Sequence, residues 1–268
     1  MKRILALVLA LLMVGAVLAG CGNKKEDTKA TSDEAAAKTE EKEVLTMATN
    51  AYFPPYEYYD GDKIVGIDAE VAQAIADKLG MTLEIKDIEF DSIITGVQTG
   101  KYDMGMAGMT VKEERLKSVD FSSSYATGVQ SIIVPVDSAI KSIDDILAEG
   151  AAYKVGVQLS TTGDIYITED LGDKAKDLVV EYQTGNDAVA ALSSGKVDAV
   201  IIDNEPAKSY VEASNGLKIL DTEYVTEDYA ICFAKGNKEL KEKVDKALSE
   251  LIADGTVKGI IDKYITAK

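Results

Sequence analysis

The side chains best suited to binding a charged group follow one predicted turn. The stretch Thr110-Val111-Lys112-Glu113 fits a capping box, so we expect a helix that begins at Thr110 with its first backbone N–H groups free to meet an anion. Arg115 lies five residues on, and its side chain should lean back toward the helix start with a guanidinium suited to a carboxylate. The pattern predicts an anion site, although Arg115 alone could be a solvated helix residue.

A second group of polar residues lies further along the chain, where two predicted strands end. The loop from Gln158 to Gly163 precedes a helical run and presents N–H groups and hydroxyls; the alternative is an ordinary capped turn. Asp203 ends an apolar strand, where a carboxylate is costly to bury without a partner; its alternative role is to cap the helix that begins near Asn204. An anion site opposite a carboxylate matches the two charged ends of an α-amino acid.

Aromatic rings can supply a third part of such a site. The stretch from Tyr52 to Tyr58 contains two prolines, which forbid a helix and predict a loop. Phe53, together with Phe90, could sandwich a ligand side chain through apolar contact and, for a cation, through a π face. Tyr56 and Tyr58 can instead form a hydrophobic lid over the core.

Composition directs the search toward binding and away from catalysis. The chain has no histidine, and Cys232 is the only cysteine after Cys21, so it lacks the residues for a zinc site, a Ser-His-Asp triad or a disulfide. We expect Cys232, in an apolar stretch, to be a small buried hydrophobe. The formal charge is −17, or −19 without Lys2 and Arg3, which argues against nucleic acid as a partner. We expect no cofactor and no metal.

One helix-to-strand unit occurs twice in the sequence. The first copy contains Gly100, Lys101 and Asp103, and the second contains Gly195, Lys196 and Asp198, so the two glycines are 95 positions apart. Each copy follows a run of periodically spaced apolar residues and leads into a short apolar strand. The two strands run toward Gly108 and Asp203. Because ligands of open α/β sheets lie outside the carboxyl ends of the strands, we expect each copy to contribute half of a binding site.

The remaining pattern alternates strands and helices and predicts an α/β protein with two lobes. Asp68 is expected to cap the helix over 67–79, and Gly80 to end it. The expected strands lie at 44–49, 83–85, 104–106, 154–157, 178–181, 197–202, 217–220 and 229–233. Lobe 1 comprises 44–124 and 230–268, and lobe 2 comprises 129–224, with hinges near 124–129 and 224–229. Two crossings between two open sheets leave a cleft for a ligand.

The beginning of the chain predicts export. Residues 1–20 form a signal peptide with Lys2 and Arg3 before an apolar run, and Leu18-Ala19-Gly20-Cys21 resembles the lipobox of bacterial lipoproteins. The alternative is a transmembrane anchor, for which the run is short against ~30 Å of hydrocarbon. Cys21 would carry the lipid, and residues 21–43 are too polar to order themselves. We therefore expect a lipid-anchored, extracytoplasmic protein at the outer face of the cell membrane.

Five segments in order resemble the polar amino-acid solute-binding proteins of ABC importers, that is, the bacterial extracellular solute-binding proteins of family 3. They are FPPYEY, GIDAEVAQAIADKL, AGMTVKEERLKSVDFS, VQLSTTG and VDAVIID. The resemblance covers the whole domain after the tether. It implies a type II periplasmic-binding-protein-like fold, which closes on one amino acid and presents it to the permease subunits of a transporter. It implies no enzymatic activity, and we expect a monomer.

The resemblance also implies a set of ligand-binding residues: Asn50, Phe53, Phe90, Gly108, Thr110, Arg115, Gln158, Thr162 and Asp203. Arg115 and the N–H groups of Thr110 and Thr162 would hold the α-carboxylate. The Gly108 carbonyl, the Thr110 hydroxyl and Asp203 would hold the α-ammonium. Phe53 and Phe90 would flank the side chain, with Asn50 and Gln158 at its far end.

The ligand and the class of protein each keep alternatives. Family members that bind cationic side chains often have an acid where Asn50 stands, and Gln158 carries no charge, so a polar side chain such as glutamine is favoured. Glu57 leaves a basic amino acid possible. The same fold could serve a ligand-sensing ectodomain or a cyclic-acid dehydratase, and an adhesive lipoprotein is a third alternative.

Overall fold

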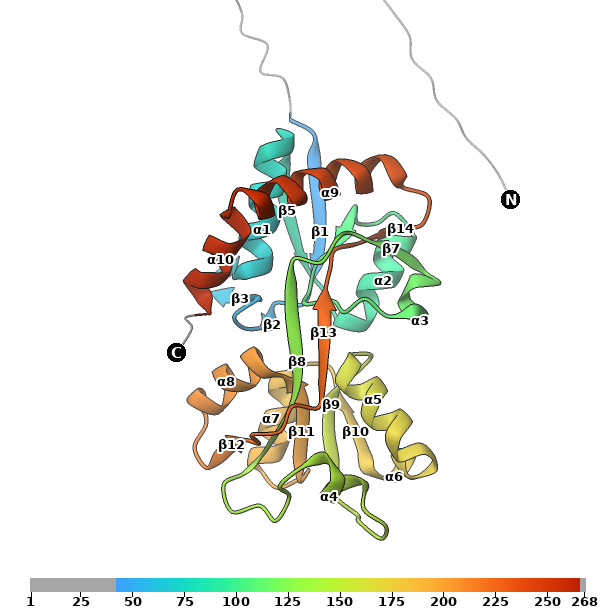
Figure 1. The fold of residues 1–268 in the computed structure, drawn as a ribbon, viewed down its shortest axis with the longest axis vertical. Helices are drawn as coiled ribbons and strands as arrows, with labels where there is room; N and C mark the ends of the chain where they lie inside the picture. Colours follow the sequence, from blue (N-terminus) through green and yellow to red (C-terminus); the bar gives the residue numbers. More distant parts are fainter. Residues whose placement is uncertain (1–41, 266–268) are drawn as a thin grey trace, which may run out of the picture. The chain divides into compact units, whose positions relative to one another are not determined.

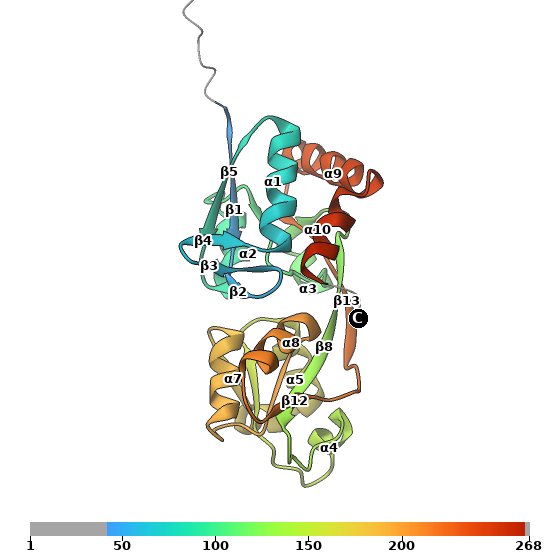
Figure 2. The same ribbon diagram turned by 90° about the vertical axis from the view of Figure 1, so that its left-hand side faces the viewer.

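The structure is a computed structural model that describes residues 42–265. The predicted signal peptide, Cys21 and nearly all of the predicted tether lie outside these residues. Within 42–265, the chain forms two α/β lobes connected by strands that run from one lobe to the other (Figure 1, Figure 2). The predicted two-lobed α/β fold is confirmed. No helix in this part of the chain is long and apolar enough to cross a lipid bilayer.

The first lobe is built on a five-stranded sheet in which β1 lies between two parallel neighbours. In spatial order its strands are β5 (Thr82–Asp87), β1 (Val44–Thr49), β6 (Met104–Gly105), β14 (Cys232–Ala234) and β7 (Val119–Phe121). Leu45, Met47 and Ala48 of β1 are fully buried, as expected for a strand with both faces covered. A small antiparallel sheet also belongs to this lobe: β2 (Tyr52–Phe53), β3 (Glu57–Asp60) and β4 (Lys63–Val65).

The second lobe repeats the parallel arrangement around β9. In spatial order its strands are β10 (Val179–Tyr182), β9 (Val155–Gln158), β11 (Ala199–Asp203), β8 (Ala126–Pro135) and β12 (Leu217–Ile219), and β13 (Val225–Tyr229) pairs with β8. Strands β10 and β11 are parallel to β9, whereas β8 is antiparallel to its neighbours. The carboxyl ends of β9 and β11 therefore lie at the same edge of this sheet.

Helices cover both sheets. Those of the first lobe are α1 (Ile67–Leu79), α2 (Phe90–Gln98), α3 (Glu113–Leu116), α9 (Lys238–Ala253) and α10 (Thr256–Tyr264). Those of the second are α4 (Ile143–Leu147), α5 (Thr162–Leu171), η1 (Gly172–Lys174), α6 (Ala175–Leu178), α7 (Gly185–Ser193) and α8 (Asn204–Ala213). Helix α1 buries Ile67, Val71 and Ile75 at i, i+4 spacing and ends at Gly80 in a left-handed conformation, as predicted.

The repeated helix-to-strand unit is present in both lobes. Helix α2 leads through Gly100 (φ 71°) to β6, and α7 leads through Gly195 (φ 70°) to β11. In each copy the aspartate side chain accepts a hydrogen bond from a backbone N–H in, or just before, the neighbouring parallel strand. Asp103 accepts from the Thr46 N–H at 2.7 Å, and Asp198 accepts from the Lys154 N–H, also at 2.7 Å. The spacing seen in the sequence thus reflects a repeated tertiary contact.

Three local predictions are wrong, each for a physical reason. Thr110 begins no helix, because residues 109–111 instead pair with 228–230 through the Val111 N–H to Asp228 carbonyl bond (3.1 Å), and α3 begins at Glu113. Asp68 does not cap α1, which Gly66 caps; Asp68 is buried in the first turn. The strand expected over 229–233 is two strands, since residue 230 pairs with the 109–111 segment.

Strands β8 and β13 connect the lobes side by side (Figure 1). They pair antiparallel from Ala126 opposite Tyr229 to Gln130 opposite Val225. The predicted hinges near 124–129 and 224–229 fall on this ladder. The bounds given for the two lobes remain our assignment.

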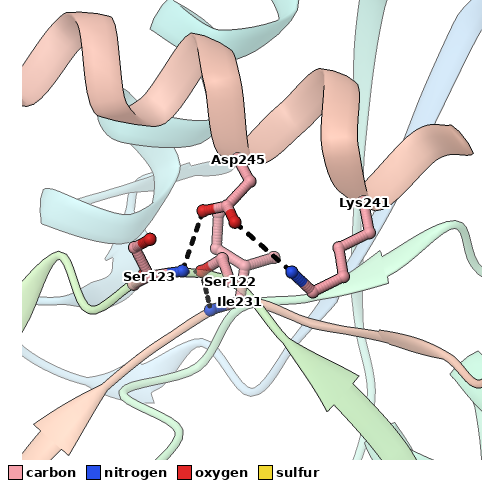
Figure 3. A network of polar contacts seen from close by, with 5 residues as sticks. All are labelled: Ser122, Ser123, Ile231, Lys241 and Asp245. Atoms are coloured by element: carbon pink, nitrogen blue, oxygen red, sulfur yellow. Dashed lines mark hydrogen bonds and ion pairs between the residues drawn. The ribbon is translucent and has the colours of Figure 1, made fainter. Parts of the chain in front are cut away.

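A polar network fixes the lobe 1 end of this ladder (Figure 3). Ser122 Oγ accepts the Ile231 N–H at 3.0 Å, and Asp245 of α9 accepts the Ser123 N–H at 2.8 Å. Lys241 lies one turn earlier on α9, and its ammonium is 3.3 Å from Asp245. Partial burial opposes ionisation, yet the hydrogen bonds from Ser123 and the charge of Lys241 hold the pKa of Asp245 below its ordinary value.

Replacing Asp245 should therefore destabilise the fold. We expect Asp245→Ala to lower the free energy of unfolding by about 1–2 kcal/mol at pH 7, as measured by urea unfolding. Because the folded pKa is depressed, this stabilisation is present above the ordinary value of 3.8 and is lost as the pH falls through the lower folded value. The matched control is Asp262→Ala on α10, whose partner Lys258 is exposed, and its effect should stay within about 0.5 kcal/mol. Equal losses in the two variants would contradict the prediction.

Candidate functional site

One pocket between the lobes is lined by every residue that the sequence predicts for the site. Its lining residues are Asn50, Phe53, Glu57, Phe90, Ala107, Gly108, Thr110, Arg115, Gln158, Thr161, Thr162 and Asp203. The space between these residues, including the part open to solvent, is about 320 Å³. The structure therefore brings the predicted residues together, and their role in binding remains a prediction.

Arg115 is the one basic residue among those that line the pocket. The residue is 7% exposed, and its guanidinium donates from Nη1 to the Thr110 carbonyl at 2.9 Å and from Nη2 to the Ser160 carbonyl at 3.0 Å. The side chain leans back toward Thr110, as predicted, and lies 5.5 Å from the centre of the Phe90 ring. Two of its five N–H groups are used on these carbonyls, so others can meet an anion.

Thr110 offers a backbone donor for a reason that differs from the predicted one. It lies opposite Tyr229 in an isolated antiparallel bridge, between the hydrogen bonds made by residues 109 and 111. In such a pair the N–H and C=O groups of Thr110 point away from the partner strand. The Thr110 carbonyl accepts a hydrogen bond from Arg115, and the Thr110 N–H points to the same side of the strand as this carbonyl. A helix N-terminus is not required here.

On the second lobe, the pocket meets the start of α5. Thr161 caps this helix by accepting the Asp164 N–H, and Thr162 is its first residue. The first N–H groups of a helix have no partner within it and carry a partial positive charge, so they favour an anion. Ser160, just before, is held at φ +64°, a conformation uncommon for a residue with a side chain, and its carbonyl faces Arg115.

Asp203 lies at the end of β11 and is 8% exposed. It occupies the cap position of α8, but its side chain makes no capping hydrogen bond and instead accepts the Tyr229 hydroxyl. Burial, opposed by the Tyr229 hydroxyl and reinforced by the charge of Glu227, raises the pKa of Asp203 to about 7. A cationic ligand group beside this carboxylate would supply the missing counter-charge.

Gly108 follows β6 and needs to be glycine. Its φ is +51°, and a Cβ atom there would lie 2.7 Å from Cε1 of Phe53. Its N–H donates to Asp68 Oδ2 at 2.9 Å. Phe53, Phe90 and Ala107 complete the apolar lining of this lobe.

Hydrogen bonds join the lobes around the pocket. Gln158 Nε2 donates to Asn50 Oδ1 at 2.9 Å, and Asn50 Nδ2 donates to the Ile88 carbonyl at 2.9 Å. The Tyr210 hydroxyl of α8 donates to the Tyr52 carbonyl in β2. With the Arg115 to Ser160 bond, three side chains cross from one lobe to the other. The structure thus shows the two lobes in direct contact across the pocket.

Two buried acidic residues near the site, Asp68 and Glu227, are not predicted from the sequence, and Glu57 is considered there only as a residue that leaves a basic ligand possible. Glu57 lines the pocket, Asp68 fixes Gly108, and Glu227 accepts the Thr162 hydroxyl at 2.7 Å. The sequence around Glu57 carries no signal of burial. Period-two alternation in β13 could have identified Glu227, because it shares the buried face with Tyr229. For Asp68, the sequence pattern that could have indicated burial is an acidic residue between apolar residues of α1.

Comparisons with known proteins find similar binding proteins. The chain is 32% identical to the "Arginine-binding extracellular protein ArtP" of Bacillus subtilis over 278 residues, which covers 100% of both chains. It is 29% identical to the "ABC transporter glutamine-binding protein GlnH" of the same species, over 99% of this chain and 98% of that one. The solved structure "An ancestral arginine-binding protein bound to glutamine" is similar, with 40% identity, a TM-score of 0.77 and coverage of 84% of this chain and 98% of the other.

These relatives confirm the expectation of a binding protein and not an enzyme. The sequence profile described as "Bacterial extracellular solute-binding proteins, family 3" matches residues 45–267, nearly the whole described chain. Fold, pocket and profile lead to one conclusion: the chain belongs to the bacterial extracellular solute-binding proteins of family 3.

Proposed function

We propose that this protein captures a single amino acid outside the cell and delivers it to the permease of an ABC importer. The observation that carries the proposal is the pocket itself, in which Arg115 from one lobe and Asp203 from the other are both buried. Arg115 with the N–H groups of Thr110 and Thr162 would hold the α-carboxylate. Asp203, the Thr110 hydroxyl and the Gly108 carbonyl would hold the α-ammonium. The lipobox-like stretch supports anchoring through a lipid on Cys21.

The charges of the pocket point to a basic ligand. Asn50 and Gln158 are uncharged and would suit glutamine, but Glu57 adds a second carboxylate to the lining. One cation and two carboxylates complement a ligand that has one carboxylate and two cationic groups. Arginine fits this balance, and its planar guanidinium can stack against Phe53 and Phe90. We therefore propose arginine as the preferred ligand and glutamine as the second, in line with relatives named for each.

Ligand binding would favour the closed arrangement. An amino acid that touches both Arg115 and Asp203 makes its full set of contacts only when the lobes meet, so it shifts the population toward closure. Each charge-assisted hydrogen bond contributes about 1.5–3 kcal/mol. The hydrogen bond from Gln158 to Asn50 joins the two lobes beside the pocket.

Calorimetric titration of residues 42–268 with each of the common amino acids tests the function. Arginine is expected to bind most tightly, to raise the melting temperature and to be recovered chemically unchanged. Failure of every amino acid to bind would overturn the proposal. Conversion of the ligand into a product would favour the dehydratase alternative.

Removing either charge should weaken binding of every amino acid. We expect Arg115→Gln and Asp203→Asn each to raise the Kd between about tenfold and a hundredfold, because each loses one charge-assisted contact. Lys208→Gln, on the exposed surface of α8, is the control and should leave the Kd unchanged. Unchanged binding in either pocket variant would discard the assigned role.

The affinity for an amino acid with an uncharged side chain should depend on pH through Asp203. Its pKa of about 7 is raised, and only the ionised form pairs with an ammonium group. The Kd for glutamine should therefore rise about tenfold as the pH falls from 8 to 6. Asp203→Asn should abolish this dependence, and a flat profile in the unmodified protein would contradict the prediction.

Glu57→Gln tests the preference for a cation. The substitution keeps the size of the side chain and removes its charge, so the Kd for arginine should rise at least tenfold while that for glutamine changes less than about threefold. The ratio of the two Kd values, obtained from parallel titrations, is the measurement. Equal changes for both ligands would show that Glu57 does not recognise side-chain charge.

A further inference from the structure

Two buried carboxyl groups meet behind the pocket. Glu57 of β3 is 1% exposed, and Asp68 in the first turn of α1 is 0% exposed. The two side chains lie close enough to form a hydrogen bond, which requires a proton on one of the two carboxyl groups. Within residues 42–265, neither Glu57 Oε2 nor Asp68 Oδ1 has a hydrogen-bond partner. One proton on the pair satisfies both oxygens.

The other oxygen of Asp68 fixes where that proton lies. Asp68 Oδ2 accepts the Gly108 N–H and the Tyr125 hydroxyl, each at 2.9 Å. Burial raises the pKa of Asp68, and these two donors oppose the rise because they stabilise its ionised form. Burial first, and then the charge of Asp68, raise the pKa of Glu57 well above its ordinary value. The arrangement therefore places the proton on Glu57, the member of the pair that lines the pocket.

Most of the other titratable groups near Glu57 and Asp68 do not exchange a proton with this pair near neutral pH. Tyr56 precedes β3, Tyr125 precedes β8, and Tyr210 belongs to α8; burial raises the pKa of all three, so they stay neutral. Asp203 at the end of β11 is the remaining group whose charge acts on Glu57. Asp203 also titrates near neutral pH, but it would meet the α-ammonium that all amino acids share.

We propose that Glu57 and Asp68 hold one shared proton in the ligand-free pocket, which a cationic ligand side chain displaces and a neutral one leaves in place. This inference rests on the proposed function. With a neutral side chain, Glu57 remains an uncharged acid and can donate or accept a hydrogen bond. With a guanidinium, the O–H bond of Glu57 breaks, the proton passes to solvent, and the carboxylate pairs with the cation. Asp68 thus sets the charge of Glu57 and acts as a positioning residue.

The number of protons released on binding measures this step directly. Titration calorimetry in buffers of different ionisation enthalpy at pH 6 gives that number for arginine and for citrulline, which has the same shape with a neutral end group. Protons lost from Asp203 are common to both ligands and cancel in the difference. We expect arginine to release up to about one proton more than citrulline, with a correspondingly steeper rise of its Kd as the pH falls.

Asp68→Asn provides the matched variant. Its amide oxygen can still accept hydrogen bonds from the Gly108 N–H and the Tyr125 hydroxyl. Its amide nitrogen can donate to an ionised Glu57, so the pair no longer needs a proton between two carboxyl groups. The excess of protons released by arginine should therefore disappear in Asp68→Asn, while arginine still binds. Glu57→Gln, which cannot ionise, should also lose the excess and provides a second variant.

The outcomes separate the inference from the function it rests on. Equal proton release for arginine and citrulline in the unmodified protein, or an excess that persists in Asp68→Asn, would overturn the inference and leave amino-acid binding intact. If Asp68→Asn fails to fold, an excess that persists in Glu57→Gln would overturn it in the same way. Absence of binding by any amino acid would instead overturn the proposed function.

Discussion

The structure depends on burying charges of opposite sign in one pocket without letting them neutralise each other. Arg115 uses two donors on the carbonyls of Thr110 and Ser160, and Asp203 accepts a tyrosine hydroxyl. A buried charge is costly unless it is paired or hydrogen-bonded. Backbone and hydroxyl partners reduce this cost and leave each charge able to attract a ligand group. A solute-binding protein of this family needs that incomplete compensation, since a closed ion pair between the lobes would exclude the solute.

Two paired strands connect the lobes. Strands β8 and β13 are paired with each other, so the lobes are linked by a ladder and not by single strands. The ladder also carries polar residues of the site: Gln130 and Glu227 lie within it, and Gln130 Nε2 donates to Glu227 Oε2 at 3.0 Å. Glu227 also accepts a hydrogen bond from the hydroxyl of Thr162 at the start of α5. The ladder between the lobes is therefore in hydrogen-bond contact with the end of the pocket that we propose binds the α-carboxylate.

Much of the fold follows from sequence pattern, because apolar periodicity and glycine positions are local properties. The helix over 67–79, its end at Gly80 and the repeated glycine and aspartate units are all of this kind. The site residues were reached by combining helix-end chemistry with family resemblance, and the pocket contains all of them. The errors concern contacts between distant segments. Thr110 has a capping-box sequence, but pairing with the strand around Tyr229 decides its conformation, and no local pattern announces that pairing. The meeting of Glu57 with Asp68 is likewise a tertiary event.

The hydrogen bond from Arg115 to the Ser160 carbonyl has a kinetic consequence. Arg115 belongs to one lobe and Ser160 to the other, so the residue proposed to hold the ligand also joins the lobes. A bound solute could leave only after this bond and its neighbours at Asn50 and Tyr210 have opened. Residence time would then be governed by lobe separation more than by the ligand's own contacts. A membrane partner that pulls the lobes apart would accelerate release without entering the pocket.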